Sequence, residues 1–258
     1  MTVATSRAAG CSDAEWAVRV ELAACYRAVA MFGMTDLVHN HITARVPGAD
    51  HHILINAYGL HYEEICASNL LKIDLDGQII TRPEGLTYGV NLAGYVIHSA
   101  VHGARPDVAC VLHTHTRAGV AVSAMAEGLL PISQTALRFL GRIGYHDFEG
   151  PATDLAERER LIAHLGQDYA LVLRHHGLLT CGRSIGEAFT LMQRLDTACK
   201  IQVDAMAGTV TLPSAEAQAR TAAMFAPTAN DPGAPPPGTI EWQAILRQLD
   251  RRDPSYRD

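Results

Sequence analysis

Apolar and polar positions repeat with two different periods along this chain, and the periods separate its helices from its strands. Helical spacing after a capping-box pattern predicts a helix over 12–31. Shorter alternating segments predict one hairpin of 41–45 with 52–55 and another of 70–73 with 78–81. Several antiparallel pairings precede any regular strand–helix alternation. The pattern therefore favours an α/β fold with a mainly antiparallel sheet over a doubly wound one.

The second half of the chain mixes buried strands with amphipathic helices. Apolar runs predict strands over 108–112 and 169–173, and helical spacing predicts helices over 92–102, 116–126, 154–165, 184–207 and 240–250. A proline-rich stretch at 231–238 has the composition of a stiff linker. We therefore expect one domain over 1–225, followed by a linker and C-terminal helix or tail over 226–258.

Composition and charge exclude several function classes. The 258 residues are 48% hydrophobic, enough for a sizeable core, and the net charge of −6 provides no basic field for nucleic acid. No apolar run reaches the length of a membrane span, and residues 1–10 lack the apolar stretch of a secretory signal. Six scattered cysteines without a C-x-x-C pair are typical of a reducing compartment, so we expect a cytoplasmic protein.

Histidines gather where the two apolar runs end. His113 and His115 follow the run 108–112, and alternation along a strand places both on one face. The run 169–173 leads into Arg174-His175-His176-Gly177, where the glycine permits close backbone packing. Such imidazoles suit a metal site, although a chain with 13 histidines could place them there by accident. Two clusters at the ends of two strands favour the metal.

These motifs resemble the class II aldolase/adducin family, over about residues 12–207. The most specific match is HSAVHGARPDVACVLHTH at 98–115, and NHITARVPG at 40–48 and INAYGL at 55–60 resemble early substrate loops. The resemblance implies an α/β/α arrangement around a central, mainly antiparallel sheet. It also implies a homotetramer with active sites at subunit interfaces, and a divalent metal held by three ligands: His113, His115 and His176.

The chain departs from the sugar-phosphate aldolases of that family at several loop positions. Their acid/base glutamate falls at Gly94, one of their tyrosines falls at Gln134, and their Thr-x-Ser-Gly phosphate loop falls at Asn56-Ala57-Tyr58-Gly59. The resemblance therefore carries over metal binding but not the aldolase base or phosphate binding. By the same resemblance, the candidate substrate-loop residues are Asn40, Asn56, Gly59, Asn91, Gly94 and Gln134. Glutamate introduced at 94 should place a carboxylate near the metal.

The sequence hypothesis is a divalent-metal-dependent lyase that acts on a small, unphosphorylated oxo- or hydroxy-carboxylic acid. Zinc is the expected metal, with Mn or Fe(II) as alternatives. The proton donor is open, and the candidates are His98, His175 and Tyr145, followed by His39, His41 and Tyr62. Each of these also has a structural interpretation as a half-buried polar residue. Glu63 and Glu64 are the adjacent carboxylates nearest to a candidate substrate loop. The competing, structural interpretation is that they lie at the solvated start of a helix.

Two other functions stay open at this stage. One is a non-haem Fe(II) oxygenase acting on an aromatic 2-oxo acid, although an all-histidine ligand set is less typical of that chemistry. The other is a non-catalytic, adducin-like binding module, although such a module could dispense with the ligand histidines. The long apolar-faced helix and the C-terminal tail predict a homotetramer in which the tail around Trp242 and Tyr256 crosses a neighbour or covers the site.

Overall fold

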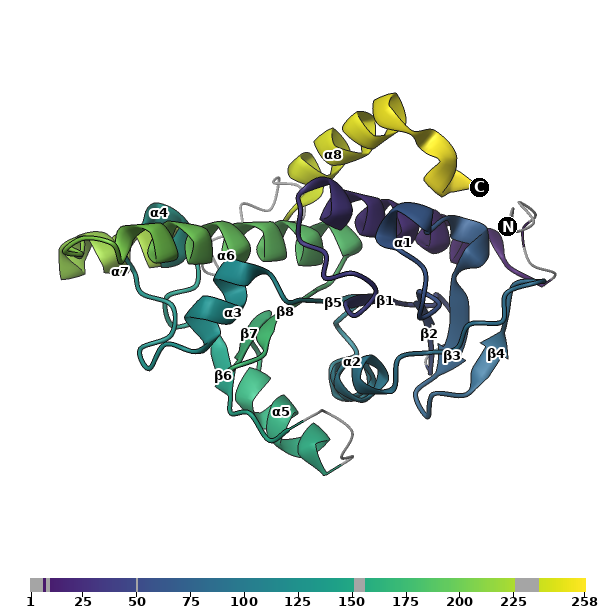
Figure 1. Ribbon diagram of the computed structural model, residues 1–258, viewed down its shortest axis with the longest axis horizontal. Helices are drawn as coiled ribbons and strands as arrows, with labels where there is room; N and C mark the ends of the chain where they lie inside the picture. The colour runs from purple at the N-terminus through teal and green to yellow at the C-terminus, as the bar shows by residue number, and fades with distance from the viewer. Residues whose placement is uncertain (1–6, 8–9, 50, 151–155, 226–236) are drawn as a thin grey trace.

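The computed structural model describes residues 7, 10–49, 51–150, 156–225 and 237–258, and it is built around one sheet (Figure 1). The eight strands lie in the order β4-β3-β2-β1-β5-β8-β7-β6, and only β6 and β7 pair in parallel. This confirms the predicted mainly antiparallel sheet. The strands are β1 (His41–Arg45), β2 (His52–Ile55), β3 (Leu71–Asp74), β4 (Ile79–Thr81), β5 (Cys110–Thr114), β6 (Gly144–His146), β7 (Ala170–Leu173) and β8 (Gly177–Gly182).

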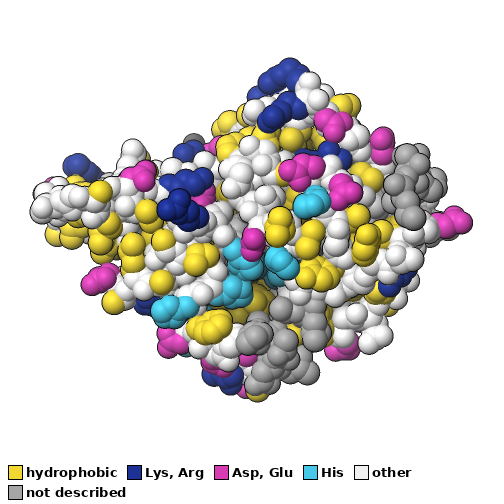
Figure 2. Space-filling model, in the orientation of Figure 1, with side chains coloured by type: hydrophobic (Ala, Val, Ile, Leu, Met, Phe, Trp, Pro, Cys, Tyr) yellow, Lys and Arg dark blue, Asp and Glu magenta, His cyan; other side chains and the backbone are white. Residues whose placement is uncertain are grey.

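Helices cover both faces of the sheet and give the expected α/β/α layering (Figure 1). Helices α1 and α6 contact one face, whereas α2 and α5 contact the other. On the face of the molecule in Figure 2, histidine side chains gather near the centre. The helices are α1 (Asp13–Met31), α2 (Leu92–Ala104), α3 (Arg117–Ser123), α4 (Gln134–Leu137), α5 (Glu157–Leu165), α6 (Ile185–Ala205), α7 (Ala215–Met224) and α8 (Thr239–Arg252), with 3₁₀ turns η1 (Tyr62–Glu64), η2 (Ala67–Asn69) and η4 (Pro254–Arg257).

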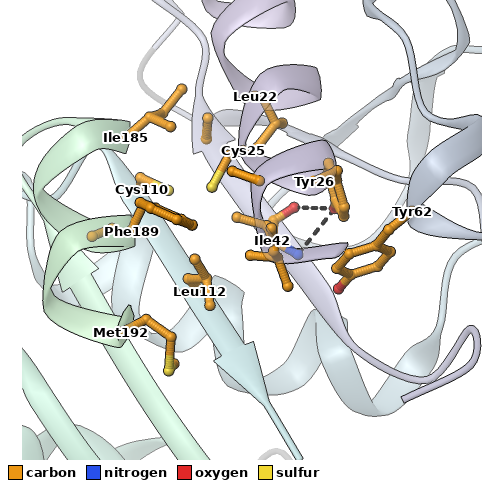
Figure 3. Packing of buried hydrophobic residues seen from close by; sticks show 14 of the residues in the cluster. Leu22, Cys25, Tyr26, Ile42, Tyr62, Cys110, Leu112, Ile185, Phe189 and Met192 are labelled. Carbon is orange, nitrogen blue, oxygen red and sulfur yellow. Dashed lines mark hydrogen bonds between the residues drawn. The ribbon is translucent and has the colours of Figure 1, made fainter. Parts of the chain in front are cut away.

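The largest core lies between α1, α6 and the sheet. Side chains of α1 and α6 converge there on Cys110 and Leu112 of β5 (Figure 3). The buried hydroxyl of Tyr26 accepts hydrogen bonds from the backbone N–H groups of Ile42, at 2.9 Å, and Asn56, at 3.1 Å. A buried hydroxyl with several partners satisfies polar groups that would otherwise be costly to bury. Tyr26 therefore ties α1 to the strand that begins with His41.

The hairpin of β7 and β8 differs from the sequence expectation. Gly177–Gly182 forms a buried strand that the periodicity did not single out, so His176 lies in a turn between two strands. Short elements β6, α4 and α7 also escaped prediction, because segments of three to ten residues give little periodic signal. The predicted start of α5 at 154 falls outside the described residues, and the helix is described from Glu157.

The C-terminal segment packs on its own chain. Trp242 and Tyr256 are buried in the same core cluster as α1 and α6, with exposed fractions of 6% and 0%. Trp242 packs so closely on α6 that a Cβ added to Gly186 would lie 2.7 Å from the indole. The expectation that these two residues lie across a neighbour or over the site is therefore wrong. The expected domain boundary at 226 lies outside the described residues, and that division stays a prediction.

Candidate metal centre

Three histidines predicted as ligands come together at one edge of the sheet. His113 lies on β5, His115 directly follows that strand, and His176 lies in the turn between β7 and β8. The Nε2 atom of His115 lies 2.7 Å from Nε2 of His113 and 3.0 Å from Nε2 of His176. The ligand atoms of all three lie within 4.8 Å of one another. Their nitrogens therefore point at a common centre.

Hydrogen bonds on the far side of two rings determine which nitrogens face that centre. Nδ1 of His113 lies 2.9 Å from the carbonyl oxygen of Leu178, and Nδ1 of His115 lies 2.9 Å from Oδ2 of Asp36. A carbonyl and a carboxylate can only accept, so each Nδ1 carries the proton in its neutral ring. Both Nε2 atoms then present lone pairs to each other. Such an arrangement is repulsive unless a cation lies between them.

Burial keeps two of the three rings, His113 and His176, neutral in the absence of a metal. Desolvation lowers the pKa of His113 well below its ordinary value, and His176 and His115 lower it further. Burial, with a contribution from His115, also lowers the pKa of His176 to about 4. At neutral pH these two rings are therefore unprotonated and available as ligands. Neutral nitrogen donors that converge in a partly buried site fit a divalent ion, and zinc in particular.

Asp36 is a functional candidate that the sequence analysis missed. It lies in the turn that follows α1. Carboxylates that accept from the outer nitrogen of a ligand histidine orient the ring and raise its basicity. No local pattern marks this pairing, because it depends on where the end of α1 packs beside β5.

A small hollow opens beside the three ligands, at the centre of the face in Figure 2. Besides the ligands, its walls come from the turn after α1, the start of β1, and the start of α2. Asn91, expected as a loop residue, is one of these wall residues, and His39 is another. The full set of wall residues other than the ligands is Asp36, His39, His41, Asn91 and Ile97.

His41 occupies the space into which a side chain at 94 would extend. A Cβ added to Gly94 would lie 2.5 Å from three atoms of the His41 ring, far inside van der Waals contact. The expectation that glutamate at 94 would place a carboxylate near the metal therefore stays a prediction, and it requires the His41 ring to move. The imidazole of His41 would first have to leave.

The first three proton-donor candidates lie outside the hollow, whereas the further candidates His39 and His41 line it. His98 is fully buried, and its Nδ1 lies 2.8 Å from the hydroxyl of Thr43. The hydroxyl of Tyr145 accepts from the backbone N–H of Leu129 at 3.0 Å, in a partly buried position. His175 is exposed and has a left-handed backbone, with φ of 56°. None of the three lines the hollow in the part of the chain that the structure describes, and their role as proton donors stays a prediction.

The predicted loop residues divide into two groups. Asn40 is buried beside His41, and neither polar atom of its side-chain amide has a hydrogen-bond partner among the described residues. Asn56 is also buried, but its Oδ1 lies 2.9 Å from the Tyr26 hydroxyl, so its side chain holds the core together. Gly59 packs against Tyr88, and Gln134 is exposed at the start of α4. The structure therefore brings Asn91 to the hollow and Gly94 against the His41 ring, but it does not place the other loop positions at the metal centre.

The remaining candidates have structural partners. Tyr62 is buried edge-to-face on Tyr26, with ring centroids 4.6 Å apart. Glu64 accepts from the backbone N–H of His61 at 2.7 Å and thus caps η1, as the helix-start interpretation of this pair expects. Its neighbour Glu63 is exposed on the same short turn.

Comparison with known proteins identifies the family. Residues 20–203 match the model of the class II aldolase and adducin N-terminal domain. The chain belongs to the class II aldolase and adducin family. This confirms the resemblance that the histidine motifs carry.

Members of this family with solved structures share the whole fold. A crystal structure of an aldolase II superfamily protein from Pseudomonas syringae is 50% identical, covers 96% of this chain and 97% of its own, and has a TM-score of 0.89. An L-fuculose 1-phosphate aldolase from Glaciozyma antarctica is 26% identical, covers 99% of this chain and 97% of its own, and has a TM-score of 0.80.

The family also contains adducins. Alpha-adducin from Rattus norvegicus is 42% identical over 243 residues, which cover 90% of this chain but 33% of the adducin. The chain thus corresponds to about a third of that relative.

Among the helices that the structure describes, none combines the length and apolar character needed to cross a membrane.

Proposed function

We propose that this member of the class II aldolase family is a divalent-metal-dependent lyase that acts on a small, unphosphorylated oxo- or hydroxy-carboxylic acid. One observation carries the proposal. The outer nitrogens of His113 and His115 are committed to Leu178 and Asp36, so their inner lone pairs converge with that of His176. A divalent ion bound at these nitrogens would make that arrangement favourable.

Three neutral imidazoles leave the full charge of the ion available to the substrate. When bound, the ion would supply Lewis acidity that stabilises negative charge as a carbon–carbon bond breaks. The chain's own residues would shape the hollow around a small acid, with His41 and Asn91 as walls. Zinc is the metal that this donor set favours, with Mn and Fe(II) as alternatives. We further propose a homotetramer, as the resemblance implies.

The inference that the substrate is unphosphorylated depends on the loop at 56–59. The segment Asn56-Ala57-Tyr58-Gly59 contains no serine or threonine hydroxyl to hold a phosphate. Its only amide side chain, Asn56, points into the core toward Tyr26. The L-fuculose 1-phosphate aldolase relative is named for a phosphorylated substrate, so this is the point at which we expect the two proteins to differ.

The similarity to alpha-adducin supports a second candidate, a binding module without catalysis. The intact three-histidine cluster favours the enzyme. An Fe(II) oxygenase acting on an aromatic 2-oxo acid would use the same cluster and differs in its need for O₂.

A substrate screen separates these functions. Protein loaded with Zn²⁺, Mn²⁺ or Fe²⁺ would be incubated with 2-oxo, 2-hydroxy and ortho-hydroxy aromatic acids, and with fuculose 1-phosphate. CO₂, carbonyl products and O₂ uptake would be measured, with His113→Ala as the matched control. The lyase proposal predicts metal-dependent turnover of an unphosphorylated acid without O₂. Efficient cleavage of fuculose 1-phosphate would contradict it, O₂ uptake only with Fe²⁺ would identify an oxygenase, and full metal loading without turnover would favour the binding module.

A further inference from the structure

The space beside the metal centre that faces Gly94 is filled by another histidine. His41 is directly opposite His113 in the antiparallel pairing of β1 and β5, and their ring centroids are 5.4 Å apart. Neighbouring residues opposite each other project to the same side of a sheet. The His41 ring therefore lies in the row of imidazoles that begins with the ligands, although its nitrogens are outside the converging group of three.

A buried nitrogen of this ring is without a partner. His41 is 4% exposed, and neither Nδ1 nor Nε2 of its ring has a hydrogen-bond partner among the described residues, so the neutral ring can carry its proton on either nitrogen. Leaving a buried polar atom unpaired is unfavourable, by an amount comparable to a lost hydrogen bond. Because His41 also lines the hollow beside the ligands, the atom that satisfies this nitrogen can come from a bound molecule.

Packing holds the ring in this position. His98 lies against it with ring centroids 4.6 Å apart, in an edge-to-face arrangement. His98 is itself fixed through the Thr43 hydroxyl, which lies 2.8 Å from His98 Nδ1 and 2.8 Å from His102 Nε2. On the other side, the absence of a side chain at Gly94 makes room for the ring. The ring is therefore held from both sides, at the wall of the hollow.

We propose that His41 is a substrate-binding residue that donates a hydrogen bond from its ring to an anionic oxygen of the acid in the metal hollow, and that Gly94 is glycine because His41 fills its side-chain space. This inference rests on the proposed function and makes it more specific. The substrate class is an acid with a carboxylate or oxo oxygen that reaches away from the three ligands toward β1. His41 then sits where a side chain at 94 would otherwise contact the substrate.

Oxalate binding to the Zn²⁺-loaded protein tests this assignment without any turnover. Bound zinc would be measured by mass spectrometry and oxalate affinity by calorimetry, in wild type, His41→Ala and the control His51→Ala, which changes an exposed histidine. We expect all three to hold one zinc per chain. Loss of one hydrogen bond to a charged group should weaken oxalate binding by roughly 10- to 100-fold in His41→Ala and leave His51→Ala unchanged.

The Gly94 half of the proposal is tested by a double-mutant cycle. Gly94→Ala should displace the His41 ring and weaken oxalate binding as His41→Ala does. In the His41→Ala/Gly94→Ala double variant the added methyl meets no ring, so the loss of fold stability seen in Gly94→Ala should be largely reversed. Stability changes that simply add would overturn this pairing.

The outcomes distinguish the two proposals. Full zinc in His41→Ala with unchanged oxalate affinity overturns the inference and leaves the metal proposal standing. Loss of zinc in His41→Ala would show that His41 is a metal ligand and not a substrate-binding residue, and it would also overturn the inference. Wild-type protein that cannot be loaded with zinc, manganese or iron overturns the proposed function and the inference together.

Discussion

Nδ1 of His115 lies 2.9 Å from Oδ2 of Asp36, although the two residues are 79 positions apart in the chain. This contact joins the turn after α1 to the end of β5. It fixes the orientation of the His115 ring and directs Nε2 toward the other two imidazoles. The metal proposal therefore gives Asp36 a role that can be measured without knowledge of the substrate.

Replacement of Asp36 by asparagine should weaken metal binding without abolishing the site. Loss of such a supporting carboxylate typically reduces metal affinity 10- to 100-fold. Competition with a chelator such as a zinc-sensitive dye would measure the dissociation constant. The control is Asp76→Asn, which changes an exposed carboxylate in the β3–β4 turn. Equal affinity in both variants would show that the Asp36–His115 contact does not support the ligand.

Gly177 should not tolerate a side chain. A Cβ at this position would lie 2.4 Å from the carbonyl oxygen of Thr114 and 3.2 Å from the His115 ring. Gly177→Ala should therefore push β8 away from β5, lower the free energy of unfolding by about 1–3 kcal/mol and reduce bound metal. Urea unfolding and metal analysis measure both effects.

Gly103→Ala is the matched control for that substitution. Its added Cβ would meet Leu75 at 3.9 Å, an ordinary contact, and it lies within α2. Alanine favours a helix more than glycine does by roughly 1 kcal/mol, so this variant should be as stable as wild type or more so. Two equally destabilised variants would mean that the contact at Gly177 has no special effect.

Buried histidines should make the metal-free protein sensitive to mild acid. Burial lowers the pKa of His102 from 6.5 to about 3, whereas an unfolded chain protonates near the ordinary value. At pH values between these two pKa values, the unfolded state binds a proton at His102 that the folded state does not bind. The free energy of unfolding therefore falls as the pH decreases from about 6.5 toward 3. Each such group contributes a slope of up to about 1.4 kcal/mol per pH unit.

His102→Gln removes one of these groups and tests the sign. Urea unfolding of the apo protein between pH 7 and pH 5 should show a shallower loss of stability in His102→Gln than in wild type. His51→Gln changes an exposed histidine and should keep the wild-type slope. A wild-type protein whose stability does not fall over this range would contradict the assignment of neutral, buried rings.

The sequence was sufficient to predict a mainly antiparallel sheet, although not β6 or β8, and to predict the three histidines that the structure brings together, because each prediction rests on local pattern. His113 and His115 end one apolar strand, and His176 with Gly177 follows another. Asp36 and His41 could not be placed in the same way. Their positions depend on the end of α1 and on the register of β1 with β5, which joins His41 to His113.

The tail shows a different limit of sequence patterns. Apolar spacing in α8 predicts that Trp242 will be buried, but it does not say against which surface. An intramolecular core and a subunit interface bury the same kinds of residue. The structure buries Trp242 beside Phe189 of the same chain, with ring centroids 5.5 Å apart.

Metal content of the purified protein tests the central claim most directly. Wild type, His113→Ala, His176→Ala and His51→Ala would be prepared anaerobically, offered equimolar divalent metal, desalted and analysed by mass spectrometry, with circular dichroism to confirm folding. We predict one ion per chain in wild type and His51→Ala, and a stoichiometric loss in folded His113→Ala and His176→Ala. Equal metal in all four proteins, or none in wild type, would contradict a metal centre built from these histidines.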